Sequence, residues 1–383
     1  MLHLCKDLST KISRLIVIRQ QFLLHQLRAK SSRRFIIRDS DNEEDEEDEI
    51  VDKEPEIQEG RLHLFKSRGQ HLLTNPRILD SIVRKSNIRP SDTVLEIGPG
   101  TGNLTMKLLE AAQRVVAVEI DKRMVEIVQK RAAELGFEDR ITVIGGDALK
   151  AEFPRFDLVV ANIPYGISSP LVAKLVFGEN KFRSATLLLQ KEFARRILAN
   201  PGDSEFNRLA ANVKLVAEVE FVMDVSKKDF VPIPKVDSSV IKIHPKEDIP
   251  VVNLNEWWAF TRTCFSKKNK TLGAIFKQKK KLMELIRLSE TRGVEGTFEA
   301  SDDGMSSEQE SDLSSSSNKR ISSFREKVID ILRSGEFEGK RPSKLSTEEF
   351  LVLLSLFNQA GIYFHDQAKL NTASDVLLAS YGS

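Results

Sequence analysis

The sequence is poor in cysteine and has no long hydrophobic run. Its 383 residues include only Cys5 and Cys264, which lie far apart in the chain. Such a pair provides neither a disulfide framework nor a cysteine-based metal cluster, so we expect no metal site and an ordinary buried thiol at Cys264. The longest aliphatic stretches, such as residues 15–18, are far shorter than the roughly 20 residues that cross a bilayer. The sequence therefore predicts no membrane span.

A large net charge is also absent, but the formal value of +2 conceals a segregation of basic and acidic residues along the chain. The segments must therefore be interpreted separately. The chain is longer than one typical domain, and 40% of its residues are hydrophobic, enough for sizeable cores. We expect two folded domains.

The first 60 residues divide into a basic part and an acidic part. Residues 1–38 contain nine Lys or Arg and one acid, with serines and threonines among apolar residues. This composition is typical of a transit peptide, and its abundant arginine favours the mitochondrion over the chloroplast. The alternative is a disordered basic arm of a nuclear or nucleolar protein. Residues 39–60 are strongly acidic, repel one another, and are expected to form a disordered spacer.

Residues 61–248 alternate between short apolar runs and helix-length polar segments. The runs lie at residues 93–97, 115–119, 141–144, 158–161 and 186–189. Such an alternation predicts a parallel sheet covered by helices on both faces. Two further segments, 218–225 and 236–244, alternate with period two and can close the sheet as an antiparallel pair.

Residues 249–383 show only helical patterns from Asn253 onward and predict a smaller helical domain. A Ser-rich and acidic insert at about residues 290–317 is expected to lack fixed structure. Basic residues between Trp257 and Arg287, above all the cluster at residues 277–281, favour RNA phosphate binding, with the neighbouring aromatic residues as core. The alternative is that these lysines are only a solvated face.

A glycine-rich turn follows the first predicted strand, at residues 96–102. Glycines there let the backbone approach a ligand closely. Their spacing is Gly-x-Gly-x-Gly, whereas a dinucleotide fingerprint has Gly-x-Gly-x-x-Gly, which favours a nucleoside without a pyrophosphate. Glu119 ends the second strand, where a carboxylate can accept both ribose hydroxyls. The alternative is that Glu119 caps the next helix.

Polar residues also follow the third and fourth strands. Asp147 is either an acceptor for the amine of an adenine or a common turn residue. Residues 162–165 read Asn-Ile-Pro-Tyr and supply an amide, a fixed carbonyl and an aromatic ring, which suits a planar amino-bearing base. Alone they could be an ordinary turn. In this order, the four motifs resemble an S-adenosylmethionine-dependent amino-methyltransferase.

Two flanking motifs make the resemblance more specific. Residues 66–76 and 229–239 resemble segments of the ribosomal RNA adenine N6-dimethyltransferases, the KsgA-type or dimethyladenosine transferase family, and the basic N-terminus suggests an organellar member. The resemblance covers about residues 61–285 and resumes near the C-terminus. It implies a class I, Rossmann-like fold with a doubly wound, mostly parallel seven-stranded sheet, and S-adenosylmethionine as cofactor.

The resemblance also implies roles for individual residues. It places Gln70, His71 and Leu73 at the methionine part of the cofactor, Gly98 and Gly100 beneath it, Glu119 at its ribose, Asp147 at its adenine amine, and Asn162 where cofactor and target base meet. The Asn162 side-chain oxygen and the carbonyl of Ile163 or Pro164 would accept the amino hydrogens of the base. Tyr165 and Phe230 would stack on its two faces, although Phe230 can also be read as plain core. Family members often have Leu at position 163 and a polar residue at 166, where this chain has Ile163 and Gly166.

The implied activity is the dimethylation of two adjacent adenosines near the 3′ end of small-subunit ribosomal RNA, within a pre-ribosomal particle, by a monomeric enzyme. The alternative is a mitochondrial transcription or ribosome-assembly factor of the same family with little or no catalysis. A dehydrogenase is disfavoured by the glycine spacing.

Overall fold

The computed structural model describes residues 70–293 and 310–365. The predicted transit peptide at 1–38, the acidic spacer at 39–60 and residues 66–69 of the family motif lie outside these ranges. Within them, no helix is long and apolar enough to cross a membrane.

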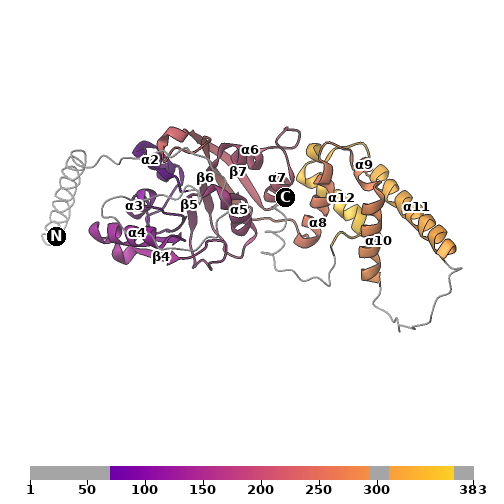
Figure 1. Cartoon of the computed structure of the whole chain (residues 1–383), viewed down its shortest axis with the longest axis horizontal. Coiled ribbons are helices and arrows are strands. Elements are labelled where there is room, and N and C mark those ends of the chain that lie inside the picture. The colour runs from indigo at the N-terminus through magenta and orange to yellow at the C-terminus, as the bar shows by residue number, and fades with distance from the viewer. Residues whose placement is uncertain (1–69, 294–309, 366–383) are drawn as a thin grey trace, which may run out of the picture. The chain divides into compact units, whose positions relative to one another are not determined.

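The centre of the fold is a seven-stranded sheet with the order β4-β3-β2-β5-β6-β9-β7 (Figure 1). Its strands are β2 (Thr93–Ile97), β3 (Arg114–Glu119), β4 (Ile141–Gly145), β5 (Leu158–Asn162), β6 (Ser184–Gln190), β7 (Ala217–Val225) and β9 (Ser238–Pro245). Strands β2 to β6 are parallel, whereas β9 runs antiparallel to both β6 and β7. The predicted doubly wound sheet, including its antiparallel closing pair, is confirmed.

The sheet is buried on both faces because successive residues of its strands pack into different cores. Leu95 and Val159 belong to the core on one face, whereas Val94, Leu158 and Val160 belong to the core on the other. A strand that is buried on both faces must be apolar throughout, which accounts for the uninterrupted runs in the sequence.

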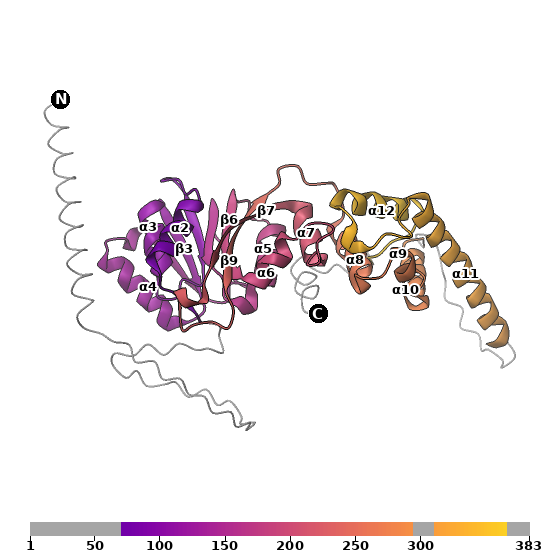
Figure 2. The same cartoon turned by 90° about the horizontal axis from the view of Figure 1, so that it is seen from above.

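The helices that precede β5 in the chain cover one face of the sheet, and the helices that follow it cover the other (Figure 2). Helices α2 (Pro76–Lys85), α3 (Asn103–Ala111) and α4 (Lys122–Glu134) contribute to one core, and α5 (Ser168–Phe177), α6 (Lys191–Leu198) and α7 (Arg208–Val216) to the other. The side chains of Asn75, Asp121 and Asn207 cap the first turns of α2, α4 and α7. These caps satisfy backbone N–H groups that have no partner within the helix.

A two-stranded antiparallel sheet joins two distant segments and was not predicted. Strand β1 (Leu72–Leu73) pairs with β8 (Phe230–Val231), which follows the short 3₁₀ helix η4 (Lys227–Asp229). A pairing of two residues each leaves no periodic pattern in the sequence. It places the two flanking family motifs beside each other.

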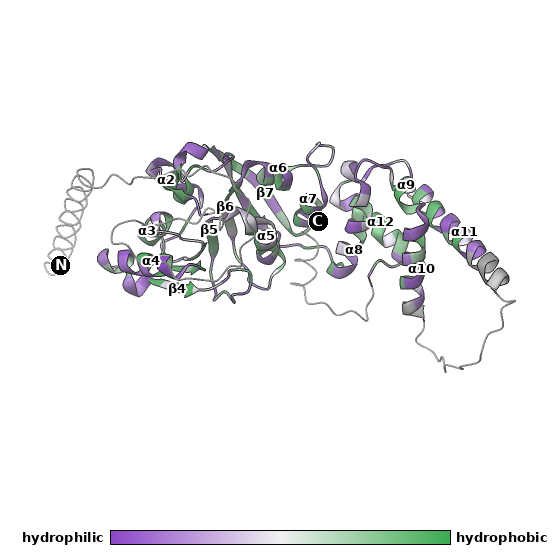
Figure 3. Ribbon diagram, in the orientation of Figure 1, coloured by the Kyte–Doolittle hydropathy of each residue, from purple (hydrophilic) through white to green (hydrophobic). Residues whose placement is uncertain are grey.

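The C-terminal part of the described chain is helical, as predicted. It comprises α8 (Leu254–Cys264), η5 (Phe265–Lys267), α9 (Leu272–Phe276), α10 (Lys279–Gly293), α11 (Glu310–Ser334), η6 (Pro342–Lys344) and α12 (Thr347–Gln359). Its aromatic residues form a buried cluster that includes Trp257, Phe260 and Phe357, and Cys264 is buried beside them. The aromatic residues are therefore core, as expected. The same helices also carry polar residues (Figure 3).

The predicted insert at about residues 290–317 requires a correction at both ends. Helix α10 continues to Gly293 and α11 begins at Glu310, so these ends are helical, while residues 294–309 lie outside the described chain. Val328 and Leu332 of α11 are fully buried. Once such packing fixes part of a helix, further residues of modest helix propensity can extend it.

A buried amide joins the sheet domain to the helical part. Asn212 of α7 is fully buried, and its Oδ1 accepts hydrogen bonds from Trp257 Nε1 and Thr261 Oγ1 of α8, both at 3.0 Å. The apolar core around it continues from the sheet into α8, α9 and α12. The two parts thus share one core.

We predict that Asn212→Ala lowers the free energy of unfolding by about 2 kcal/mol, because the buried indole N–H of Trp257 loses its acceptor. Denaturant titration of the full chain measures this change. Gln359→Ala, which removes an exposed hydrogen bond to Ser355, is the control and should cost less than about 0.5 kcal/mol. Equal midpoints for the two variants would contradict the importance of this contact.

Candidate active site

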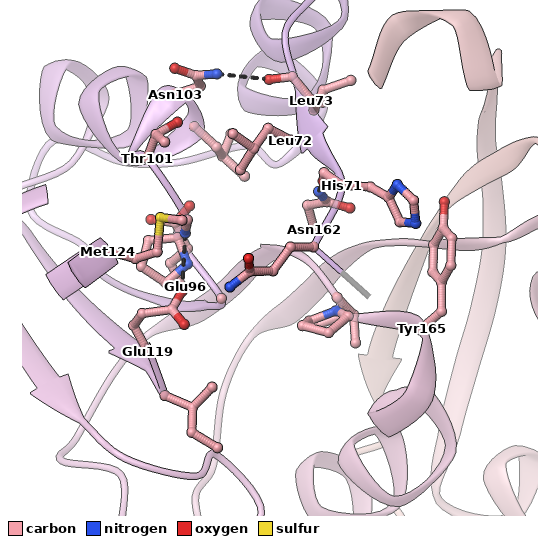
Figure 4. A pocket seen from close by; sticks show the side chains of 18 of the residues that line it. His71, Leu72, Leu73, Glu96, Thr101, Asn103, Glu119, Met124, Asn162 and Tyr165 are labelled. Carbon is pink, nitrogen blue, oxygen red and sulfur yellow. Dashed lines mark hydrogen bonds between the residues drawn. The ribbon is translucent and has the colours of Figure 1, made fainter. Parts of the chain in front are cut away.

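A cavity lies at the carboxyl ends of β2, β3 and β5 (Figure 4). The sequence-predicted residues that line it are Gln70, His71, Leu73, Gly98, Gly100, Glu119, Asn162, Pro164 and Tyr165. The carboxyl edge is where open parallel sheets bind ligands. The fold therefore brings most of the predicted residues together around one space.

Asp147 does not line this cavity. It follows β4 at the same edge of the sheet, and its Oδ1 accepts a hydrogen bond from the backbone N–H of Leu149 at 2.9 Å. This contact stabilises the turn after β4. Asp147 therefore makes the turn contact of its alternative reading, and its contact with an adenine amine stays a prediction.

Phe230 also departs from the prediction. Its side chain is 1% exposed and belongs to the core cluster that contains Leu73, Leu79 and Val225, and it does not line the cavity. A ring without a free face cannot stack on a base. The pairing of β8 with β1 buries Phe230, so in this structure it is core.

The glycines of the 96–102 turn are required by close contacts as well as by backbone conformation. Gly98 and Gly100 have φ angles of 68° and 55°, a backbone conformation that residues other than glycine rarely adopt. A Cβ atom on Gly98 would lie 3.2 Å from Pro164 Cδ, and one on Gly100 would lie 2.7 Å from Leu72 Cδ2. The turn is therefore packed directly against the 162–165 segment and against β1.

The Glu119 carboxylate is buried at the end of β3 and accepts two backbone hydrogen bonds. They come from Gly100 N at 3.1 Å and from Asp121 N at 3.0 Å. The N-cap of α4 is Asp121, which accepts from Arg123 N, so Glu119 does not cap that helix. Burial raises the pKa of Glu119, and the two N–H donors oppose this shift.

The entry segment, residues 70–73, is fixed by contacts to several elements. Gln70 Nε2 donates to Asp121 Oδ2 at 2.9 Å, and Asn103 Nδ2 donates to Leu73 O at 3.0 Å. His71 Nδ1 lies 2.9 Å from Pro232 O and acts as the donor, since a carbonyl oxygen can only accept. The segment thus forms one wall of the cavity.

The Asn162 side chain has its amide nitrogen engaged. Nδ2 donates to His71 O at 3.3 Å, which directs the other amide atom, Oδ1, away from that carbonyl. Next along the chain, Ile163 N donates to Leu188 O at 3.1 Å, and Pro164 O accepts from Ile167 N at 3.1 Å. With Pro164 O already accepting in the turn, the carbonyl of Ile163 is the better second acceptor for a ligand.

The Tyr165 ring is held from two sides. Its hydroxyl is 2.7 Å from Ser238 Oγ, and its ring stacks on the imidazole of His71 with centroids 5.9 Å apart and planes inclined by 29°. Burial raises the pKa of Tyr165, so the side chain remains a neutral phenol at physiological pH. His71, rather than Phe230, is the aromatic neighbour of Tyr165.

Several residues that line the cavity were missed by the sequence analysis, among them Glu96 and Ile120. Glu96 opens the glycine-rich motif and is 1% exposed, and its Oε2 has no hydrogen-bond partner within the described residues. Burial raises its pKa to about 8, the Thr105 hydroxyl opposes this shift, and the nearby charge of Glu119 adds to it. Ile120 is 62% exposed and offers an apolar surface beside Glu119. An acid inside an apolar strand was the available signal for Glu96.

Lys174 of α5 fixes the turn that carries Asp147. Its Nζ donates to the carbonyls of Ala148, Leu149 and Ala151 at 2.9, 3.1 and 2.5 Å, and it lies 4.3 Å from the ring centre of Phe153. Helix α5 begins shortly after Tyr165. Lys174 therefore links the turn after β4 to the helix that follows the 162–165 segment.

The raised pKa of Glu96 predicts a pH-dependent stability of the ligand-free protein. Between about pH 4.5 and 8 the folded state keeps a proton on Glu96 that the unfolded chain releases, so stability falls as pH rises through this window. Glu96→Gln, which mimics the neutral acid, should become more stable than the wild type by at most about 1.4 kcal/mol per pH unit.

The measurement is the free energy of unfolding of both proteins at several pH values from 4 to 8.5. Glu110→Gln, which changes an exposed side chain of α3, is the control and should follow the wild-type profile. Parallel profiles for the wild type and Glu96→Gln would show that Glu96 has the same pKa in the folded and unfolded states, and would contradict the raised pKa.

Comparison with known proteins identifies the family. Residues 62–307 match the family model described as ribosomal RNA adenine dimethylase. The chain is 68% identical over 315 residues to the "Ribosomal RNA small subunit methyltransferase, mitochondrial" of Arabidopsis thaliana. This alignment covers 81% of this chain and 83% of that protein. It is 42% identical over 296 residues to the "Dimethyladenosine transferase" of Saccharomyces cerevisiae, with coverages of 77% and 89%.

A solved structure agrees. The crystal structure of a dimethyladenosine transferase from Plasmodium falciparum aligns with a TM-score of 0.66 and 42% identity, covering 77% of this chain and all of that one. Family model, relatives and structure coincide over the part of the chain that builds the sheet and the cavity. The chain belongs to the ribosomal RNA adenine dimethylase family.

Proposed function

We propose that this protein transfers methyl groups from S-adenosylmethionine to the N6 atoms of two adjacent adenosines near the 3′ end of small-subunit ribosomal RNA. The observation that carries this proposal is the position of Asn162. Its amide nitrogen is bound to His71 O, while its oxygen remains an acceptor beside the glycine-rich turn. The names of the relatives, which are a ribosomal RNA methyltransferase and a dimethyladenosine transferase, support the same activity.

The residues around the cavity fit this cofactor. The bound cofactor supplies an activated methyl group on a positively charged sulfur, and its methionine part carries an ammonium group. The cavity presents two buried carboxylates, Glu96 and Glu119, the first with an unpartnered oxygen. Leu72, Ile120 and Met124 add apolar surface. Glu119 would hold the ribose. Glu96 is protonated in the ligand-free protein, and the positive charge of a bound cofactor would favour its ionised form, which would then stabilise that charge.

Asp147 remains our proposal for the acceptor of the cofactor's adenine amine. It lies at the same edge of the sheet, one strand beyond Glu119, in the turn that Lys174 holds. Its Oδ1 accepts from Leu149, and a carboxylate has acceptor capacity for further donors.

The target adenine is a weak nucleophile because the lone pair of its amino nitrogen is delocalised into the ring. Asn162 Oδ1 and the carbonyl of Ile163 would accept its two amino hydrogens and aim the nitrogen at the methyl group. Such alignment by fixed dipoles lowers the barrier without a strong general base. Tyr165, held by Ser238 and His71, would provide one stacking surface for the base after it leaves its own stack.

Two of the lysines that we expect to contact RNA phosphates are paired with acids in the helical part. Lys277 pairs with Glu338 and Lys281 with Glu284, each at 2.8 Å or less, so these two are partly neutralised. Exposed Lys279 and Lys280 lie between them. We assign this surface to sequence-independent positioning of RNA in a pre-ribosomal particle, by a protein acting as a monomer.

The alternative, a transcription or assembly factor with little or no catalysis, requires RNA or protein binding but no turnover. No feature of the described residues favours it over the enzyme. Methylation of undermethylated small subunits with labelled cofactor, followed by mapping of the modified bases, separates the two. Absence of N6-dimethyladenosine would favour the alternative.

We predict that Asn162→Ala lowers methyl transfer by about a hundred-fold or more, since one of the two acceptors is lost, while cofactor binding largely survives. Turnover is measured on undermethylated small subunits, and cofactor affinity by calorimetry.

Asn103→Ala is the matched control. It also removes a side-chain amide that donates to the entry segment, at Leu73 O, but it leaves the acceptor pair intact. It should therefore cost no more than a few-fold in turnover. Near-normal turnover in Asn162→Ala would rule out the proposed role of Asn162.

We place the protein in the mitochondrion, as the basic residues 1–38 and the name of the Arabidopsis relative suggest. A full-length chain with a C-terminal fluorescent tag should colocalise with mitochondria, and a version lacking residues 1–38 should not. Nucleolar fluorescence of the full-length chain would instead support the alternative reading of the basic segment.

A further inference from the structure

The loop around β8 exposes three apolar side chains that lie close together in the sequence. Val231, Ile233 and Val236 are 37%, 62% and 44% exposed. Single exposed apolar residues are common, but a cluster of them marks an interaction surface. We call these three residues the apolar patch.

The loop that carries the apolar patch is firmly held. Asp229 accepts from Asn75 Nδ2 at 2.6 Å, and its carbonyl accepts from Thr74 N at 2.9 Å. Asp237 accepts from Lys227 N at 2.9 Å, and its carbonyl accepts from Lys191 N at 3.0 Å. Side chains on a loop fixed at both ends are presented in a definite arrangement, as a binding surface requires.

The loop that carries the apolar patch has three lysines and two acids, and therefore a small net positive charge. Lys227, Lys228 and Lys235 are exposed on the same loop. The two acids of the loop, Asp229 and Asp237, have carboxylate oxygens that accept the internal hydrogen bonds described above. Apolar side chains among lysines match a ligand with apolar faces and a negatively charged backbone.

The apolar patch adjoins the cavity on the side of Tyr165. Val231 pairs with Leu72, which lines the cavity. Pro232 O accepts from His71, whose ring stacks on Tyr165. A nucleotide next to a base bound at Tyr165 would therefore reach this loop.

We propose that the apolar patch is a platform for the unpaired bases beside the target adenosine, with Lys227, Lys228 and Lys235 on their phosphates. This inference rests on the proposed function and names the RNA-binding surface of its site. When one base is withdrawn into the cavity, its neighbours lose a stacking partner. An apolar surface at the cavity mouth replaces part of that contact and stabilises the open RNA.

The test uses the full-length chain and an RNA fragment that contains the methylated adenosines. The variant Ile233→Ser with Val236→Ser should weaken RNA binding about five-fold or more, raise KM for RNA accordingly, and leave KM for the cofactor unchanged. Val352→Ser, which alters a 54% exposed apolar residue of α12, is the control and should bind RNA like the wild type. Equal affinities for the control and the double variant would overturn the proposal.

An abasic nucleotide next to the target adenosine identifies what the patch contacts. It should weaken binding to the wild type but change little in the double variant, because the contact is already lost. Equal losses in both proteins would overturn the platform. A defect of the double variant on whole subunits but not on the RNA fragment would point to a ribosomal protein and overturn it too. Binding is measured without turnover, so absence of methylation by the wild type would contradict the proposed function alone.

Discussion

The site depends on the burial of the parallel sheet on both of its faces. Inside such strands polar side chains have no water to bind, so they are placed where the strands end and the chain meets solvent. Glu119 and Asn162 occupy such ends. Glu96 is an exception, since it lies within β2, and burial there raises its pKa to about 8. A buried acid with a perturbed pKa that lines a cavity is a candidate for contact with a ligand.

The sequence predicted what depends on local patterns. Apolar runs, the glycine spacing and the order of polar strand ends located the sheet and most of the cavity, because each follows from a few neighbouring residues. The errors arise where distant segments meet. Phe230 has the composition of a stacking residue, and only its pairing with Leu73 across β1 and β8 reveals that it is buried. The partial neutralisation of Lys277 likewise depends on Glu338, 61 residues away.

Side chains at the base-binding end of the cavity are held more firmly than the lysines that we expect to contact RNA. Side chains at the base-binding end are fixed by hydrogen bonds and stacking, as for Tyr165 with Ser238 and His71. The lysines expected to meet phosphates are exposed on helices and loops. This division suits the task, since methyl transfer requires exact alignment, whereas contacts to a repeating phosphate backbone tolerate small displacements.

The contact between Gly98 and Pro164 joins the two halves of the cavity. There is little room for a side chain between them, so a shift of the glycine-rich turn on binding would press on the segment that carries Asn162 and Tyr165. If such a shift couples the two ends, thermodynamic reciprocity makes the coupling factor equal in both directions. If a bound cofactor favours the base, a base that stays in place after one transfer favours the next cofactor by the same factor.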